Sequence, residues 1–389
     1  MVYIGYIDQY RPKVFQVVSS TNWDQWIQES TDNLVSNDQW RKITDFDSTD
    51  NYFIDDQGRR LLNFSSNDYL GMSQNPKVIQ AGIDATLRWG TGTCASRLIN
   101  GGRSIHKDLE AELADWKKTE SALLFSSGMS ANIGILSSLG TKDVCIYSDE
   151  LNHASIIDGC RLSKAEVKVY AHKDIEDLSL LWDDSKRGIV VTDAVFSMDG
   201  DSAPIEELVE FCSQKEAILI LDEAHMVFDE LVGKISSYNY LLQMGTLSKT
   251  VGSVGGFVAG KKNLLDLITN KARSLIFSTA PTPSSMAAAL EAIKIIQSEK
   301  GDELKQRLSS YIDIFSPPNH CPIIPIIFKS STASLQASQF LKQNGYFIPA
   351  IRPPSVTEDT SRIRITLSAA HKEQDVRTLK SLVDQLSTI

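Results

Sequence analysis

The centre of the chain alternates short β-rich runs with amphipathic helical patterns, and this alternation restricts the possible folds more than any other feature. The strand-like runs and the helical patterns between them are, in chain order, Ala122–Phe125, Ser130–Leu139, Val144–Tyr147, Ala154–Leu162, Val167–Tyr170, Ile175–Trp182, Gly188–Phe196, Ile205–Glu216 and Ala217–Leu221. Strands separated by helices need crossover connections, and such connections build a mostly parallel sheet. The sequence therefore predicts an α/β fold.

The segments on either side of this region have different patterns. Residues 1–60 are polar and weakly periodic, and we expect an N-terminal arm with a helix near Trp23–Val35. The α/β region would form a large domain over residues 61–283, and a helical pattern at Ser284–Ser298 would open a smaller α+β domain over residues 284–389. That last segment reads strand, helix, strand, helix at Ile323–Phe328, Ala333–Gln343, Ile363–Ser368 and Val376–Leu386.

Composition and charge argue against several classes of protein. No stretch approaches the roughly 18 consecutive apolar residues of a membrane span. The net charge is −10 and basic residues form no long run, so we expect neither nucleic acid nor a membrane as a partner. The start of the sequence lacks the pattern of a secretory leader, and no cysteine pair has C-x-x-C spacing. We therefore expect a cytoplasmic protein with reduced, mostly buried thiols at Cys94, Cys145, Cys160, Cys212 and Cys321.

Asp222 follows directly after the buried run Ile218–Leu221. An acid at the end of a buried strand costs several kcal/mol unless a cationic group meets it. A protonated pyridine nitrogen would fit, and the pairing would keep that ring electron-withdrawing. A capping aspartate and a carboxylate ligand of a metal are the alternatives.

Lys249 stands among small residues at the end of a later strand-like run, followed by Gly252, Gly255 and Gly256. A lysine in such a place can be desolvated, which lowers its pKa toward the range where the neutral amine attacks a carbonyl. The glycines would let a ligand approach the backbone. Taken alone, Lys249 is also compatible with a solvated surface position.

The turn Phe125–Asn132 lies between a strand and a helix, and Gly128 would let a ligand come close to the backbone. Free N–H groups at a helix N-terminus favour a phosphate. The alternatives are a simple capped turn and a serine hydrolase, because Ser130 lies in a near match to a nucleophile elbow. Gly90 and Gly92 are a still weaker partial match to a dinucleotide motif.

A phosphate turn, a strand-end aspartate and a lysine, in this order, are what a pyridoxal-phosphate enzyme needs. From about Leu61 to its C-terminus the chain resembles the α-oxoamine synthase family of fold-type I pyridoxal-phosphate enzymes. The stretches that carry the resemblance are Asn63–Gly71, Ser96–Leu98 with His106, Leu109 and Glu110, Asn152–Gly159, Val195–Pro204, Asp222–His225, Thr246–Lys249 and Arg362–His371.

The resemblance implies a three-layer large domain that binds pyridoxal 5'-phosphate, and a role for each matching residue. Lys249 would hold the cofactor as a Schiff base, His153 would stack on its ring and Asp222 would pair with the pyridine nitrogen. The remaining cofactor residues implied are His225 and Ser197 beside the ring hydroxyl, Gly128, Met129 and Thr246 at the phosphate, and Thr279 reaching the phosphate from the partner subunit. The residues implied in substrate binding are Arg41, Asn67, Arg364 and Ser355.

The reaction implied is condensation of an amino acid with an acyl thioester, with loss of carbon dioxide, in a homodimer whose active site lies at the subunit interface. The motifs favour L-alanine and a pimeloyl thioester of CoA or acyl carrier protein, a reaction of biotin biosynthesis. Family members that use other amino acids and acyl groups are the alternatives. A catalytically silent relative is another, because Met226–Glu230 replaces a glycine-rich stretch that is usual in the family.

Overall fold

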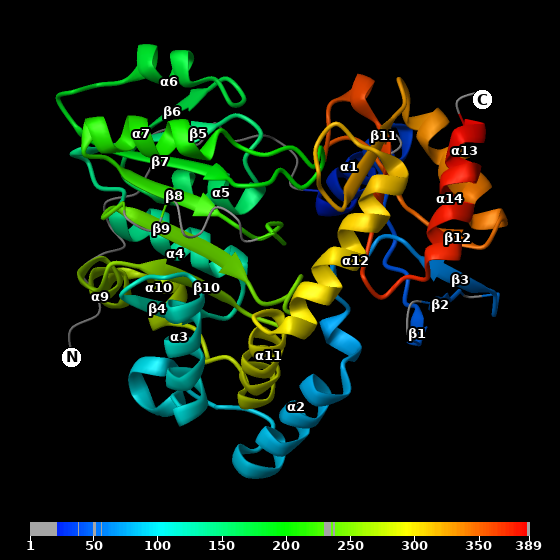
Figure 1. The fold of residues 1–389 in the computed structure, drawn as a ribbon. Coiled ribbons are helices and arrows are strands. Elements are labelled where there is room, and N and C mark those ends of the chain that lie inside the picture. Colours follow the sequence, from blue (N-terminus) through cyan, green and yellow to red (C-terminus); the bar gives the residue numbers. More distant parts are fainter. Residues whose placement is uncertain are drawn as a thin grey trace.

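The computed structural model describes residues 22–37, 39–49, 52–55, 57–228, 235 and 238–386, and a seven-stranded sheet forms its centre (Figure 1). The strand order is β4-β10-β9-β8-β7-β5-β6, and only β10 runs against its neighbours. The strands are β4 (Ser121–Phe125), β5 (Val144–Asp149), β6 (Glu166–Tyr170), β7 (Arg187–Asp193), β8 (Ile218–Asp222), β9 (Leu241–Thr246) and β10 (Gly256–Gly260). The predicted mostly parallel α/β fold is confirmed.

Helices cover both faces of this sheet because successive strand side chains point to opposite sides. Ile189 and Val191 of β7 face one helical layer, whereas Val190 faces the other. The first layer is α4 (Gly128–Leu139), α5 (Ala154–Leu162), α9 (Lys262–Lys271) and α10 (Arg273–Ile276). The second is α6 (Ile175–Leu181) and α7 (Ile205–Lys215), with α2 (Pro76–Trp89), α3 (Ser104–Trp116) and α11 (Pro283–Ile296) beyond them on the side of β4 and β10. This arrangement is the expected three-layer domain.

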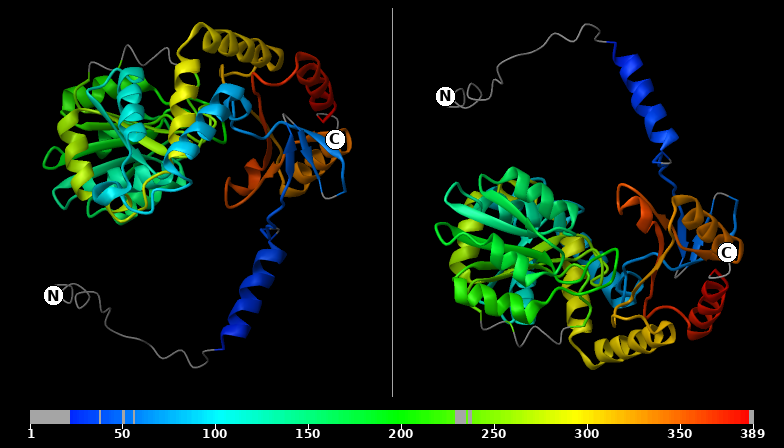
Figure 2. Two further views of the ribbon diagram at one scale, coloured as in Figure 1. Left: turned by 90° about the horizontal axis from the view of Figure 1, so that it is seen from below. Right: turned by 90° about the horizontal axis from the view of Figure 1, so that it is seen from above.

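A smaller part of the structure contains two further sheets (Figure 2). One has the order β1-β2-β3-β12 and the other β11-β14-β13. Their strands are β1 (Asp47–Thr49), β2 (Tyr52–Ile54), β3 (Arg60–Asn63), β11 (Ile323–Ile327), β12 (Tyr346–Phe347), β13 (Ala350–Ile351) and β14 (Arg362–Thr366). The helices of this part are α12 (Glu299–Phe315), which leads into it, α13 (Ser331–Gln343) and α14 (Glu373–Leu386). Strands from both ends of the chain therefore build one structural unit.

Three local features differ from the sequence predictions or extend them. The strand expected at Gly188–Phe196 ends at Asp193, because Val195 pairs with Ser202 in a separate hairpin. The helix expected at Ser284–Ser298 ends at Ile296, and the long helix α12 follows it. The predicted N-terminal helix is confirmed as α1 (Trp23–Ser36), which projects away from the rest of the chain (Figure 2). The domain limits at residues 60 and 283 stay predictions.

Two findings concern membranes and thiols. Within the described ranges, no helix is both long and apolar enough to cross a bilayer. All five cysteines are free, and each of them except Cys94 is buried.

A buried ion pair lies behind the strand edge that carries Asp222. Lys117, at the end of α3, places its Nζ atom 2.8 Å from the Glu223 carboxylate, and both side chains are almost fully buried. The Lys117 ammonium also lies 4.2 Å from the ring centre of Trp116. Buried charges need such partners because leaving either one alone in the interior is costly.

We expect Lys117→Met to lower the free energy of unfolding by about 3–5 kcal/mol, because it leaves Glu223 charged and buried. Urea denaturation measures this change. Lys118→Met is the matched control, since Lys118 pairs with Asp115 on the surface and exposed pairs contribute little. Equal effects of the two substitutions would contradict the assignment of the buried pair.

Candidate active site

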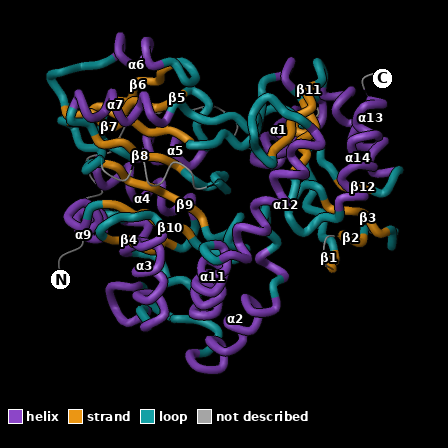
Figure 3. The backbone as a smooth tube through the Cα atoms, in the orientation of Figure 1, coloured by secondary structure: helices purple, strands orange, loops and turns teal. Residues whose placement is uncertain are grey.

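Three neighbouring strands of the central sheet end in buried aspartates. Asp149 ends β5, Asp193 ends β7 and Asp222 ends β8, and Asp193 lies directly opposite Asp222 in the register. Figure 3 shows that the loops leaving these strands gather on the side of the sheet that faces the smaller part. The carboxyl ends of parallel strands are where α/β proteins place their ligands. The candidate site therefore lies at this edge of the sheet.

Asp222 accepts two hydrogen bonds from neutral groups. The side-chain amide of Asn132, on α4, donates to its Oδ2 at 2.8 Å, and the N–H of Ala224 donates to its Oδ1 at 3.0 Å. Within the described chain, no basic side chain forms an ion pair with this carboxylate. The side-chain oxygen of Asn132 is also buried, with no hydrogen-bond partner among the described residues. The arrangement fixes the carboxylate and leaves its charge available to a cationic ligand.

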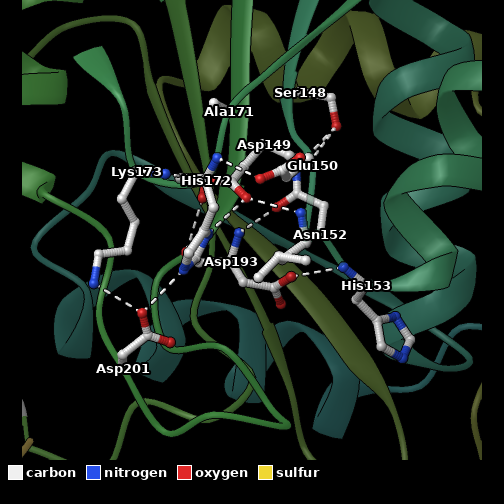
Figure 4. A network of polar contacts seen from close by, with 12 residues as sticks. Ser148, Asp149, Glu150, Asn152, His153, Ala171, His172, Lys173, Asp193 and Asp201 are labelled. Carbon is white, nitrogen blue, oxygen red and sulfur yellow. Dashed lines mark hydrogen bonds and ion pairs between the residues drawn. The ribbon is translucent and has the colours of Figure 1, made fainter. Parts of the chain in front are cut away.

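His153 caps the start of α5 beside this pair. The backbone N–H of His153 donates to Asp193 Oδ2 at 2.7 Å (Figure 4). The ring Nδ1 of His153 lies 2.7 Å from the Ser155 hydroxyl. Burial lowers the pKa of His153 below its ordinary value, so the ring is neutral near pH 7. Burial, reinforced by the charge of Asp222, raises the pKa of Asp193 well above the usual range.

Lys249 lies three residues beyond the end of β9 and contacts His225. Its Nζ is 2.8 Å from His225 Nε2. Burial lowers the pKa of Lys249, although the carboxylates of Asp222 and Asp193 oppose the shift. Burial, and then the charge on Lys249, lowers the pKa of His225 well below its ordinary value. The lysine amine thus loses its proton more easily than a surface lysine would.

A chain of hydrogen bonds runs from His225 to Arg364. The Tyr69 hydroxyl lies 2.6 Å from His225 Nδ1 and donates to Asn67 Oδ1 at 3.2 Å. The same Asn67 oxygen accepts from both terminal nitrogens of Arg364, at 3.1 and 3.2 Å. Arg364 Nε donates to the backbone oxygen of Ser197 at 2.5 Å. Tyr69 therefore links the predicted site residues into one connected network, whose other members are Lys249, His225, Asn67, Arg364 and Ser197.

The start of α4 is open to an anion. Within the described chain, the N–H groups of Gly128 and Met129 have no hydrogen-bond acceptor, whereas Ser127 caps the N–H of Ser130. A side chain on Gly128 would begin 3.4 Å from Cβ of Thr246, so the two segments lie in contact. The Thr246 hydroxyl donates to the carbonyl of Gly255 at 3.0 Å. The Ser130 hydroxyl accepts from the backbone N–H of Ser127 at 2.9 Å, as the second member of a capping box does.

Three predicted residues lie outside these networks. Arg41 donates to the hydroxyl of Ser355 at 3.2 Å, and Arg41 is exposed. Thr279 is exposed in the single chain. Part of the unusual stretch Met226–Glu230 falls outside the described residues, since the description stops at Phe228.

Sequence reasoning missed three residues of the site. Asp193 ends a buried strand as Asp222 does, so the argument used for Asp222 would have found it. Asn132 and Tyr69 lie inside stretches that the resemblance covers, but only the structure shows that they contact Asp222 and His225. A pattern of residues cannot indicate which of them meet across the fold.

We expect Lys249→Met to stabilise the cofactor-free protein at neutral pH, because burial penalises the charged lysine. The folded pKa of Lys249 is lowered, so wild-type stability is greatest above the unfolded lysine value of about 10.4 and falls as the pH drops toward the folded pKa. As the pH falls over this range, the free energy of unfolding of the variant should exceed that of the wild type by at most about 1.4 kcal/mol more for each pH unit.

Urea denaturation at several pH values measures this difference. The exposed Lys107 provides the control, since Lys107→Met removes a lysine without removing a buried amine. A pH-independent difference for Lys249→Met would contradict the lowered pKa.

Comparisons with known proteins agree with this geometry. The family model described as aminotransferase class I and II matches residues 59–381. The 8-amino-7-oxononanoate synthase 2 of Bacillus subtilis (strain 168) is 38% identical over 371 residues, which cover 91% of this chain and 95% of that protein. The 8-amino-7-oxononanoate synthase of Anaeromyxobacter sp. (strain K) is 41% identical over 330 residues, which cover 79% of this chain and 82% of that protein.

The fold also matches a solved structure of SPT, a serine palmitoyltransferase, with PLP as its internal aldimine. That match has a TM-score of 0.84 and 28% identity, and covers 94% of this chain and 97% of that one. The family match spans most of the chain, including the three aspartate-bearing strand ends and Lys249. The chain belongs to the aminotransferase class I and II family and, within it, to the α-oxoamine synthases.

Proposed function

We propose that this chain is a pyridoxal-phosphate-dependent acyltransferase of the 8-amino-7-oxononanoate synthase type. It would join the Cα atom of L-alanine to the carbonyl carbon of a pimeloyl thioester, with release of the free thiol and carbon dioxide. The observation that carries the proposal is the contact of Lys249 with His225. Asp222 and Arg364 lie close enough to influence the pKa of Lys249 electrostatically. The names of the relatives support the acyl transfer and the biotin pathway.

The residues present fit pyridoxal phosphate at each of its functional groups. The unpaired carboxylate of Asp222 suits a protonated pyridine nitrogen, and the free N–H groups of Gly128 and Met129 suit the phosphate. Thr246 adds a hydroxyl beside them. The lowered pKa of His153 favours its neutral ring, and the side chain is exposed at the start of α5, where it could stack on the ring of the cofactor. When bound, the cofactor supplies an electron sink for the charge that develops at the substrate Cα atom.

Lys249 is suited to hold the cofactor and to accept a proton from the substrate. Its lowered pKa favours the neutral amine, which is the form that attacks an aldehyde and takes up a proton. His225 orients this amine, because a neutral His225 can accept from Lys249 at Nε2 while its Nδ1–H donates to Tyr69. Tyr69 then donates onward to Asn67. The direction of every bond in the chain is thereby fixed.

Arg364 and Asn67 would bind the carboxylate of the amino acid. The two terminal nitrogens of Arg364 converge on a single amide oxygen, and a carboxylate offers the same fork two oxygens. The substrate would then displace Asn67 from the fork. Arg41 and Ser355 lie further out, where a second carboxylate such as that of a pimeloyl group could be held. The thioester carrier would be CoA or acyl carrier protein.

The complete site would form in a homodimer. Thr279 is exposed in the single chain and would reach the phosphate of the partner subunit's cofactor. The chain would act in the cytoplasm, with no nucleic acid or membrane as a partner.

A second α-oxoamine synthase activity remains a candidate because of the similarity to SPT. In that case the amino acid would be L-serine and the acyl group longer. The stretch after His225 also departs from the usual glycine-rich pattern, which is the reason to test for a silent relative as well.

Pyridoxal phosphate added to the purified protein, followed by borohydride, should label Lys249 and no other lysine. Only a neutral amine close to the aldehyde forms the imine that borohydride traps. Peptide mapping by mass spectrometry locates the label. A label on a different lysine, or equal labelling of a Lys249→Ala variant, would refute the cofactor site.

A panel of L-alanine, glycine and L-serine against thioesters of different acyl length should show the highest kcat/KM for L-alanine with pimeloyl thioester. Release of free thiol is the measurement. Preference for L-serine with a long acyl group would favour the serine palmitoyltransferase activity. Absence of thiol release with every pair, in protein that still carries the label on Lys249, would identify a silent relative.

A further inference from the structure

A hairpin at residues 194–203 connects the central sheet to the smaller part of the structure. Its base lies on the sheet, since the N–H of Ala194 donates to the carbonyl of Asp222 at 2.8 Å and the N–H of Ala203 donates to the carbonyl of Ala194 at 3.1 Å. Its backbone also carries the Ser197 oxygen that accepts from Arg364. The position of the Arg364 guanidinium therefore depends on where this hairpin lies.

The tip of the hairpin is held against β11 and β14. Gly200 has a φ of +69°, and a Cβ atom there would lie 2.5 Å from the carbonyl oxygen of Ile323. Arg362 donates to the carbonyl of Met198 at 3.0 Å and pairs with Asp199 at 2.5 Å. The smaller part thus fixes the tip by charge and by close contact.

His172, which follows β6, holds the hairpin at Asp201, next to its tip. His172 Nδ1 lies 3.0 Å from Asp149 Oδ1 and its Nε2 lies 3.0 Å from Asp201 Oδ2 (Figure 4). Lys173 also directs its Nζ at Asp201, at 2.8 Å. Asp149 belongs to β5 and Asp201 to the hairpin, so the imidazole joins the two across the end of the sheet.

The geometry requires His172 to be doubly protonated. Ionised carboxylates only accept hydrogen bonds, and a neutral imidazole has one N–H, so it cannot donate to both aspartates. Burial opposes the charge, but the hydrogen bonds to Asp149 and Asp201 outweigh it and raise the pKa of His172. The pKa of Asp201 is lowered, because Lys173 and His172 outweigh its burial. An imidazolium between two carboxylates is therefore the form of His172 that makes both hydrogen bonds.

Further contacts show that the arrangement is built around this ring. The edge of His172 meets Phe196 of the hairpin, with ring centres 4.4 Å apart at 87°. Lys173 adopts a left-handed φ of 62°, which is unfavourable for a non-glycine residue. Its N–H donates to Asp149 Oδ2 at 2.9 Å. Strained backbone of this kind persists where the surroundings fix it.

We propose that His172 is a positioning residue for the amino-acid substrate: its imidazolium ties the hairpin to β5 and so holds the carbonyl of Ser197 against the guanidinium of Arg364. The proposal rests on the proposed function, in which Arg364 binds the substrate carboxylate. His172 itself contacts neither substrate nor cofactor.

The charged groups that face His172 determine its response to pH. Asp149 and Asp201 face its ring, Glu150 accepts from its backbone N–H at 3.0 Å, and Lys173 shares Asp201. The two carboxylates favour the charged ring and Lys173 opposes it. Because the pKa of His172 is raised in the folded protein, its link to Asp149 and Asp201 is complete below about pH 6.5. The link is lost as the pH rises through the pKa of His172 in the folded protein.

The test compares His172→Gln, Asp201→Asn and the double variant in the cofactor-loaded enzyme. Each single substitution should raise KM for the amino acid about tenfold, as expected for loss of a hydrogen bond between charged groups. The kcat should stay within about twofold, because the substrate is held less well but reacts by the same groups. The double variant should have about the same KM as each single variant, since both single substitutions remove the same hydrogen bond between His172 and Asp201. Unchanged KM in His172→Gln, or additive effects, would overturn the proposal.

The pH dependence provides a readout that a merely structural role would not move. The wild-type KM should rise on the alkaline side, and His172→Gln should lack that rise. Carbon-13 NMR of labelled histidine in the cofactor-free protein measures the ring without any turnover. The resonance missing from the His172→Gln spectrum should titrate above about pH 6.5. Titration below that value would overturn the proposal.

Two further variants separate failure of this proposal from failure of the proposed function. His320→Gln is the matched control, because His320 is exposed. The KM of this variant for the amino acid should equal that of the wild type. Arg364→Lys keeps the charge but loses the fork, and it should raise KM more than His172→Gln does. Unchanged KM in Arg364→Lys would refute the carboxylate site. A raised KM in Arg364→Lys with wild-type KM in His172→Gln would refute only the role of His172.

Discussion

The cost of burying charge at one edge of a sheet governs the structure around the active site. Asp149, Asp193 and Asp222 end adjacent or near-adjacent strands, and each is almost fully buried. A carboxylate in such a place must be paired, hydrogen-bonded or protonated. Asp149 meets a histidine, Asp193 meets a backbone N–H and has a raised pKa, and Asp222 accepts from neutral donors. The three solutions differ, and Asp222 is hydrogen-bonded at both oxygens without a basic partner among the described residues.

The same cost explains why the basic groups of the site are so closely arranged. Lys249, His225 and Arg364 would repel one another if all were charged, and burial lowers the pKa of the first two. Arg364 keeps its charge and is held by oxygen atoms from Asn67, Ser197 and Thr366. The site therefore combines one permanent cation with two basic groups whose charged forms burial disfavours.

Much of this could be predicted from the sequence, and the limits have a physical cause. The strands and helices between Ala122 and Leu221 follow hydrophobic periodicity, which is a local signal. The prediction at Phe196 failed because a hairpin begins before the strand-forming residues end. Asn132 and Tyr69 were missed because their roles come from contacts between distant segments. Arg41 and Ser355 do contact each other, which spacing along the chain could not indicate. The catalytic roles assigned to Lys249, Asp222 and His153 stay predictions.

The parallel pairing of β3 with β12 has a consequence for synthesis on the ribosome. Leu62 lies opposite Tyr346, and the N–H of Thr366 donates to the carbonyl of Phe64 at 2.8 Å. One edge of β3 pairs with β2, which is made earlier, but its other edge must wait for a partner that emerges nearly three hundred residues later. The central sheet between residues 121 and 260 can form before that, since its partners are all present by then. Asn67 can meet Arg364 only when the nascent polypeptide is almost finished, so an incomplete translation product would contain Lys249 but not the contact between Asn67 and Arg364.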